Sequence, residues 1–275
     1  MPMINRIVKA VSLEEAYVLN QTRSNRVLGG FMWLKMSKRR INTGIDLSRL
    51  GLDTIVETAD GFSIGCMCTL RELELHPGLN RAFQNAIREA VRPIVGVQFR
   101  NGATLGGSIY GRYGFSDLLT CLMALDATVE LYPTGIMPLS EFAAAPYSRE
   151  ILVRLHLNKD QRKITYHSQR LTRTDFPVIA VAVAQKDQTL YIAVGARPMK
   201  ARLLIKPDCG LTAQSSPQEL RAFARGAATQ FNYGSNLRGS SDYRRHLAAV
   251  YLHRGIAELL QAKGGADHAD PLMVK

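Results

Sequence analysis

The sequence has few cysteines and no long apolar run. Its 275 residues include four cysteines, spaced neither as a disulfide framework nor as a zinc or iron–sulfur site: Cys66, Cys68, Cys121 and Cys209. We expect reduced structural thiols, because a buried free cysteine behaves as a small hydrophobic side chain. No apolar run reaches the roughly 18–20 residues of a bilayer-spanning helix. Early charged residues also argue against a signal peptide, so we expect a soluble cytoplasmic protein with no membrane partner.

Acidic residues are fewer than basic ones, 23 against 35, which gives a formal net charge of +12. A basic protein attracts polyanions such as nucleic acids. Here, however, the lysines and arginines are spread along the chain and accompany no helix-turn-helix, zinc-finger or RNA-binding signature. We interpret the charge as a solvated surface, or one that faces an acidic protein partner, and expect no nucleic-acid binding.

A recognisable catalytic or metal-binding constellation is also missing. Ser108 and Ser116 lack a nucleophile-elbow motif. No metal-ligand spacing relates the six histidines, and the G-x-G-x-x-G dinucleotide fingerprint is absent. We therefore expect no catalytic residue and no metal ligand on this chain, so that redox chemistry would come from a cofactor.

Local patterns predict a mixed α/β half up to about residue 160. Asp60-Gly61 is typical of the tight turn of a hairpin. Thr69 with a glutamate three residues later predicts a capped helix start, and residues 81–91 have helical periodicity. The apolar run "LLTCLMALDA" predicts a buried helix, capped by Ser116 or Asp117.

The second half is predicted to be α+β. "KITYHSQRL", "PVIAVAVAQ" and "TLYIAVGA" have the composition and alternation of three strands. Two longer helices are expected near residues 217–231 and 241–262, followed by a frayed tail.

Two Gly-Gly pairs, Gly29-Gly30 and Gly106-Gly107, each follow a strand-like approach. Glycine permits positive φ, so that consecutive N–H groups point into one concavity, and it has no side chain to block a ligand. Two such nests fit a pyrophosphate, as in a dinucleotide; the alternative is two tight turns. Asp117 begins the next helix, either as a cap or as an acceptor for sugar hydroxyls.

The run "FRNGATLGGSI…SDLLTCLMALDATVEL" closely resembles the signature of the FAD-binding subunit of the xanthine dehydrogenase and carbon monoxide dehydrogenase family of molybdenum hydroxylases. "FSIGCMCTLREL", "TRTDFPVIAVAVA" and "GSSDYRRHLAAVYLHRGI" resemble further segments of that family, in the same order. The resemblance covers about residues 4–262.

The resemblance implies a PCMH-type, vanillyl-alcohol-oxidase-like FAD-binding domain over residues 1–160, made of two α/β subdomains over about 1–55 and 56–160. A carbon-monoxide-dehydrogenase-flavoprotein C-terminal α+β domain would follow over 161–263, with a flexible tail over 264–275. It also implies FAD on this chain. Partner chains would carry two [2Fe-2S] clusters and the molybdenum cofactor, and NAD is a possible acceptor.

The same resemblance implies which residues bind FAD. Both Gly-Gly segments would hold the pyrophosphate with backbone amides, Leu105 would pack near the flavin ring, Asp117 would accept from a cofactor hydroxyl, and Leu152 would line the pocket. The full expected set is Val27, Leu28, Gly29, Gly30, Phe31, Met32, Thr104, Leu105, Gly106, Gly107, Ser108, Asp117 and Leu152.

One segment departs from the family pattern. Where the family has Ala-Gly-Gly-Thr-Asp-Leu, this chain has Leu28-Gly29-Gly30-Phe31-Met32, which removes a threonine hydroxyl and a carboxylate but no backbone amide. Two functions follow: an electron-transfer flavoprotein subunit, or a degenerate docking subunit of the same complex with weak or no FAD binding. A stand-alone flavin oxidoreductase is a third alternative.

Overall fold

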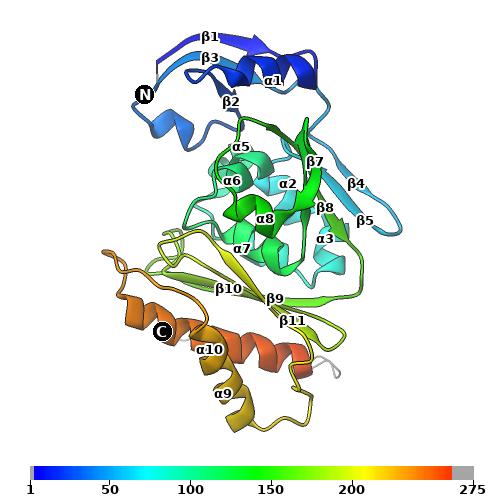
Figure 1. Ribbon diagram of the computed structural model, residues 1–275, viewed down its shortest axis with the longest axis vertical. Helices are drawn as coiled ribbons and strands as arrows, with labels where there is room; N and C mark the ends of the chain where they lie inside the picture. Colours follow the sequence, from blue (N-terminus) through cyan, green and yellow to red (C-terminus); the bar gives the residue numbers. More distant parts are fainter. Residues whose placement is uncertain (1–2, 262–275) are drawn as a thin grey trace.

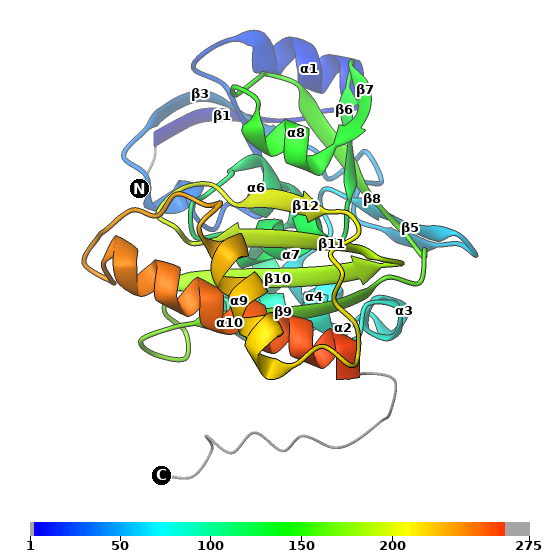
Figure 2. The same ribbon diagram turned by 60° about the horizontal axis from the view of Figure 1, so that its bottom comes forward.

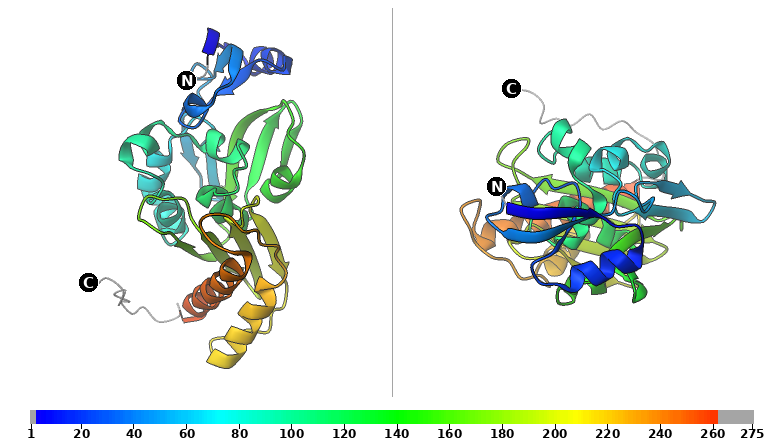
Figure 3. Two further views of the ribbon diagram at one scale, coloured as in Figure 1. Left: turned by 90° about the vertical axis from the view of Figure 1, so that its left-hand side faces the viewer. Right: turned by 90° about the horizontal axis from the view of Figure 1, so that it is seen from above.

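The structure, a computed structural model, describes residues 3–261, which form three β-sheets stacked along the long axis of the molecule (Figure 1). The three-stranded sheet lies at one end, the five-stranded sheet in the middle and the four-stranded sheet at the other end. The side view in Figure 3 shows the same order of layers. The mixed α/β class expected from the sequence is confirmed. The predicted tail over 264–275 lies outside the described residues.

The first sheet is parallel, with strand order β1-β3-β2. Helix α1 crosses between β1 and β2 and begins after Ser12, whose hydroxyl accepts a hydrogen bond from the Glu15 amide. Gly29 and Gly30 directly follow the end of β2, as the sequence predicts. The elements are β1 (Met3–Lys9), α1 (Leu13–Gln21), β2 (Arg26–Leu28), the 3-10 helix η1 (Leu34–Met36) and β3 (Arg40–Asp46).

The second sheet is antiparallel, in the order β4-β5-β8-β6-β7. The predicted hairpin is confirmed, because Glu57 pairs with Phe62 across the turn. Thr69 caps the first helix of this layer with a complete capping box. The strands are β4 (Ile55–Glu57), β5 (Gly61–Gly65), β6 (Thr128–Tyr132), β7 (Gly135–Pro138) and β8 (Ile151–Asn158). The helices are α2 (Leu70–Leu75), α3 (Pro77–Ala82), α4 (Ala86–Val91), α5 (Val97–Gly102), α6 (Leu105–Tyr110), α7 (Asp117–Ala124) and α8 (Leu139–Ala144).

One prediction about this layer is wrong. Residues 81–91 are not one helix, because Gln84 and Asn85 have φ of 46° and 62° and end the helical run between α3 and α4. Most of the glycine-rich segment before α7, for which no element was predicted, forms α5 and α6. The buried helix after Ser116 is confirmed: it is α7, and all eight of its residues are buried.

The third sheet is antiparallel, in the order β12-β11-β10-β9, and α9 and α10 cover its outer face (Figure 2). Successive side chains of β10 point to opposite faces of the third sheet. Val181 and Val183 pack with the core under α9 and α10, whereas Ala182 and Ala184 join the core of the middle layer. Small side chains allow close approach: a methyl group on Gly195 would lie 2.0 Å from the Thr120 hydroxyl of α7. The elements are β9 (Lys163–Gln169), β10 (Ile179–Lys186), β11 (Thr189–Gly195), β12 (Arg202–Lys206), α9 (Pro217–Ala228) and α10 (Ser241–Gln261).

The three sheets lie within residues 3–46, 55–158 and 163–206. The domain borders near 55 and 160 stay predictions. None of the helices in the described part of the chain has the length and apolar character to cross a membrane.

Candidate cofactor site

The two Gly-Gly segments are in direct contact, although more than 70 residues separate them. We call residues 29–33 the first glycine loop and residues 102–108 the second glycine segment. A methyl group built on Gly30 would lie 1.3 Å from the carbonyl oxygen of Gly102. One on Gly29 would lie 2.8 Å from the Thr104 hydroxyl, and one on Gly102 would lie 2.8 Å from the Met32 sulfur. No group fits between the two backbones at this point.

Close approach, not positive φ, explains these glycines. None of Gly29, Gly30, Gly106 and Gly107 has a positive φ, so the expected left-handed nest is absent. The residue that does have one is Phe31, at φ 61°. That conformation is unfavourable for a bulky side chain, and it turns the first glycine loop where it leaves Gly30.

In the second glycine segment, the amides of residues 105–108 all have partners within the protein. The amide of Leu105 donates to the Cys68 carbonyl, and that of Gly106 donates to the Cys66 carbonyl, both at 2.8 Å. The next two amides donate to Thr104, one to its hydroxyl at 3.2 Å and one to its carbonyl at 3.1 Å. These bonds join α6 to the turn after β5.

The first glycine loop is the richer source of donors. The Gly30 amide makes a long bond of 3.4 Å to the Thr104 hydroxyl. Four other amides make no hydrogen bond within residues 3–261, namely those of Gly29, Phe31, Met32 and Trp33. Backbone donors without a protein partner need water or a ligand. The first glycine loop therefore carries the free amides, although its side chains depart from the family pattern.

Asp117 faces the protein interior. Its carboxylate accepts from the Arg170 guanidinium at 2.6 Å and from the Tyr166 hydroxyl. The Asp117 side chain is 5% exposed and that of Arg170 is 8% exposed. Burial raises the pKa of Asp117 to about 6, against the opposing influence of Arg170 and Tyr166. Asp117 thus joins α7 to β9 and the segment after it.

The other charges of the glycine-rich stretch have structural partners as well. Arg100 forms a buried ion pair with Glu74 of α2 at 2.7 Å. Arg112 donates to the Ala145 carbonyl at 2.6 Å, and its guanidinium lies 4.0 Å from the centre of the Phe142 ring. Both arginines therefore hold neighbouring helices in place.

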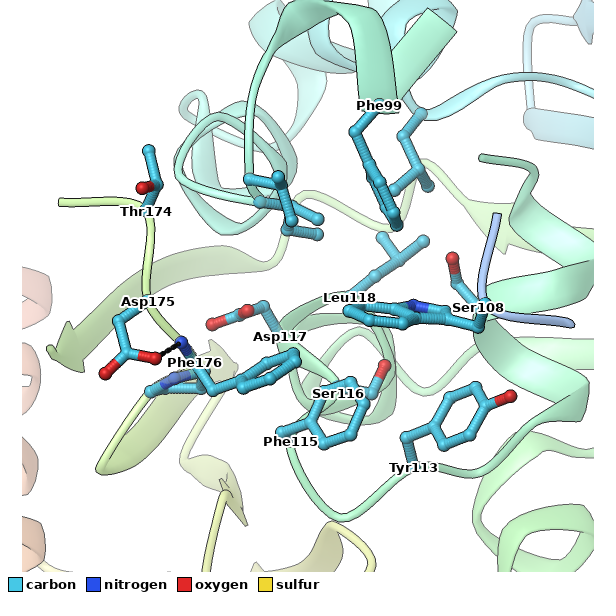
Figure 4. Close-up of a pocket in the computed structure, with 15 residues that line it drawn as sticks. Phe99, Ser108, Tyr113, Phe115, Ser116, Asp117, Leu118, Thr174, Asp175 and Phe176 are labelled. Carbon is cyan, nitrogen blue, oxygen red and sulfur yellow. Dashed lines mark hydrogen bonds between the residues drawn. The ribbon is translucent and has the colours of Figure 1, made fainter. Parts of the chain in front are cut away.

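A cavity of about 40 Å³ lies beside Trp33, between α5, the start of α7 and the segment after β9. Ser108 and Asp117 of the expected set line it. Figure 4 shows Phe99, Phe115 and Phe176 surrounding this space, with Ser108 and Asp117 at its edges.

The remaining expected residues lie elsewhere. Leu105 is buried in the core of the middle layer. Leu152 is buried in β8, where it pairs with Leu131 of β6. Val27 pairs with Ile45 inside the first sheet. These side chains support the scaffold and do not line the cavity.

Reactive side chains are scarce around the site. All four cysteines are free, as predicted, and burial raises the pKa of Cys66 to about 12 and that of Cys68 to about 11. Within residues 3–261, no three of the histidine, cysteine, aspartate and glutamate side chains lie close enough together to hold a metal ion.

Several residues of this region were missed by the sequence analysis. Trp33 is the centre of an aromatic group that includes Phe115 and Phe176. Tyr166 and Arg170 hold Asp117. The aromatic residues in "RYGF", beside the glycines, were the sequence signal that could have predicted the aromatic group. No local signal could have predicted the partners of Asp117, because they lie 49 and 53 residues away in the sequence.

The fold defines the class of protein. Its architecture matches that of chains in the solved structures of carbon monoxide dehydrogenase and quinoline 2-oxidoreductase. Carbon monoxide dehydrogenase from Hydrogenophaga pseudoflava matches with a TM-score of 0.81 and 21% identity, over 96% of this chain and 100% of that chain. Quinoline 2-oxidoreductase from Pseudomonas putida 86 matches with a TM-score of 0.79 and 20% identity, over 95% and 98%.

Sequence comparison identifies the family. Residues 3–158 match the FAD binding domain in molybdopterin dehydrogenase, and the chain belongs to this family. The glyceraldehyde dehydrogenase medium chain of Sulfolobus acidocaldarius is 26% identical, over 92% of this chain and 97% of its own length. The xanthine dehydrogenase FAD-binding subunit of Escherichia coli O157:H7 is 26% identical, over 80% and 82%. The chain is thus an oxidoreductase subunit that carries the FAD-binding domain of the molybdenum hydroxylases.

The candidate site has free backbone donors beside a small cavity. The first glycine loop has free amides that suit a pyrophosphate. Sites for drug-sized ligands typically measure about 300–1,000 Å³, whereas this cavity measures about 40 Å³. The two glycine segments touch, and Asp117 is already paired. The cavity beside Trp33 is too small, in this conformation, to hold FAD.

Proposed function

We propose that this chain is the FAD-binding electron-transfer subunit of a multi-subunit molybdenum hydroxylase. It would take electrons from a [2Fe-2S] small subunit, which a molybdopterin-binding large subunit reduces, and pass them to NAD or another acceptor. The likeness to medium chains over nearly the whole length supports this role. The location of the complex in the cytoplasm stays a prediction.

The observation that carries the proposal is the set of free amides on the first glycine loop. Amides bind phosphate oxygens whatever side chain stands beside them. The loss of the family's threonine and aspartate therefore leaves the backbone donors in place. When bound, FAD supplies the redox chemistry, and the chain supplies binding and orientation.

A second function is favoured by the small cavity. The chain would dock the iron–sulfur and molybdenum subunits while binding FAD weakly or not at all. The buried pair Arg100–Glu74 stabilises the middle layer, and Asp117–Arg170 joins that layer to the third sheet, without a cofactor. Net charge of +12 also suits docking against acidic partner surfaces.

The experiment is to purify the assembled complex, with its iron–sulfur and molybdenum subunits, and measure flavin. We expect a flavin absorbance spectrum and about one FAD released per copy of this chain on denaturation. The control is the same complex after incubation with excess FAD and removal of free FAD. A complex that assembles intact but holds no flavin in either preparation contradicts the electron-transfer function and supports the docking function.

A further inference from the structure

A group of aromatic rings closes the candidate site. Trp33, on the first glycine loop, has its ring centre 5.2 Å from that of Phe99, 5.6 Å from Phe115 and 5.4 Å from Phe176. Tyr113 lies further out, at 6.5 Å. These distances lie in the range of favourable aromatic pairing. We call these five residues the Trp33 cluster.

The cluster is assembled from segments that are remote in sequence. Phe99 belongs to α5, Phe115 precedes α7, and Phe176 precedes β10 of the third sheet. Phe115 and Phe176 pack at 4.2 Å between ring centres. Arg238 covers the Phe176 ring at 5.0 Å. The first glycine loop is thus held against both the middle layer and the third sheet.

The position of the cluster matters because of what surrounds it. The free amides lie on the same loop as Trp33. The cavity of about 40 Å³ that Ser108 and Asp117 help to line is lined by all five rings of the cluster. Trp33, Phe115 and Phe176 are only partly buried, so the cluster lies at the surface of the protein. A loop held there by side-chain packing and by one long amide bond to Thr104 can move without unfolding the core.

We propose that the FAD site is closed in this structure, because the Trp33 cluster itself occupies it. The first glycine loop, carrying Trp33, must leave Phe115 and Phe176 before a dinucleotide enters. This inference rests on the proposed function. It assigns to the ring of Trp33 the role of a gate, and to the amides of the same loop the role of binding the pyrophosphate once the loop is open.

Two measurable consequences follow. The apparent affinity for FAD is the intrinsic affinity reduced by the fraction of molecules that are open. The rate of binding also levels off at high FAD concentration, because loop opening and not encounter becomes limiting. Loosening the cluster at a ring away from the loop raises both the affinity and the limiting rate.

The test uses the full chain and exploits its single tryptophan, Trp33. Emission of Trp33 is followed in stopped flow after mixing with FAD, for the wild type and for Phe176→Ala. Tyr243→Ala is the control, because Tyr243 is an exposed aromatic residue on α10, outside the Trp33 cluster. Phe115→Leu is a second variant that removes a ring but keeps apolar volume if Phe176→Ala folds poorly.

We expect a saturating rate for the wild type and the control. We expect about a tenfold higher limiting rate and affinity in Phe176→Ala and Phe115→Leu, the factor that corresponds to about 1.4 kcal/mol. Equal rates and affinities in all four proteins, or a wild-type rate that rises linearly with FAD, would overturn the closed state but not the proposed function. Absence of FAD binding in all four proteins and in the assembled complex would overturn both.

Discussion

Replacing Arg170 with methionine tests whether Asp117 is a structural anchor. Arg170 and Asp117 form an ion pair at 2.6 Å with side-chain exposures of 8% and 5%. Methionine keeps much of the apolar length of arginine but removes the charge. The change therefore leaves a buried carboxylate whose remaining side-chain partner is the Tyr166 hydroxyl.

The magnitude follows from the distance and the burial. At 2.6 Å and an effective dielectric constant of about 20, Coulomb's law gives an attraction of about 6 kcal/mol. Breaking a buried pair typically costs about 3–5 kcal/mol in stability. Asp117 can escape part of that cost by taking up a proton, since its pKa is already raised to about 6. We expect a loss of about 3 kcal/mol at pH 8.

The pH dependence has a definite sign. Loss of Arg170 raises the pKa of folded Asp117 above 6, further from its unfolded value of 3.8. A raised pKa contributes stability at low pH that disappears as the pH rises through the folded value. The destabilisation by Arg170→Met should therefore shrink to about 1 kcal/mol at pH 5, the size of the lost hydrogen bond.

The assay is urea unfolding followed by circular dichroism at pH 8 and pH 5. Arg92→Met is the matched control, because Arg92 pairs with Glu89 at the surface, with exposures of 52% and 43%. Such a pair contributes about 0–1 kcal/mol. The double variant Asp117→Asn/Arg170→Met should be more stable than Arg170→Met alone. A cost for Arg170→Met no larger than that of the control, or equal at both pH values, would refute the anchor role.

Two further changes test the local geometry. Gly30→Ala places a methyl group 1.3 Å from the backbone oxygen of Gly102, so it should cost at least about 1–3 kcal/mol of thermal stability. Gly107→Ala meets only a side-chain oxygen at 3.2 Å and should cost less; equal costs would contradict the backbone contact. Asp160→Asn removes a carboxylate that pairs with Arg162. Burial alone would raise the pKa of Asp160, but its bonds to Arg162 lower that pKa to about 2. The loss should be about 2 kcal/mol at pH 7 and should vanish as the pH falls from about 4 to about 2, and a loss that persists at pH 2 would contradict the pairing.

Much of the fold was predictable because its signals are local. Ser116 and Thr69 satisfy the first amides of their own helices, so a few neighbouring residues suffice to locate each start. The alternation of valine and alanine in β10 likewise separates two faces within one strand. Residues 81–91 were mispredicted because periodicity does not reveal the left-handed residues at Gln84 and Asn85.

The candidate site was predicted only in part. The two Gly-Gly segments do meet, as the resemblance implies. The amides of residues 105–108 bond to Cys66, Cys68 and Thr104, whereas four amides of the first glycine loop have no partner within residues 3–261, and the FAD-binding roles of both segments stay predictions. Which carbonyl an amide meets depends on segments that are far away in the sequence.

By itself, the sequence determined the family, the class of fold and most helix and strand positions, since these rest on motifs and on periodicity within single segments. Only the tertiary structure decided that Asp117 pairs with Arg170 and that Trp33 meets Phe115 and Phe176. The physical reason is that a buried charge or a free amide is defined by its surroundings. Those surroundings form only when remote segments pack together.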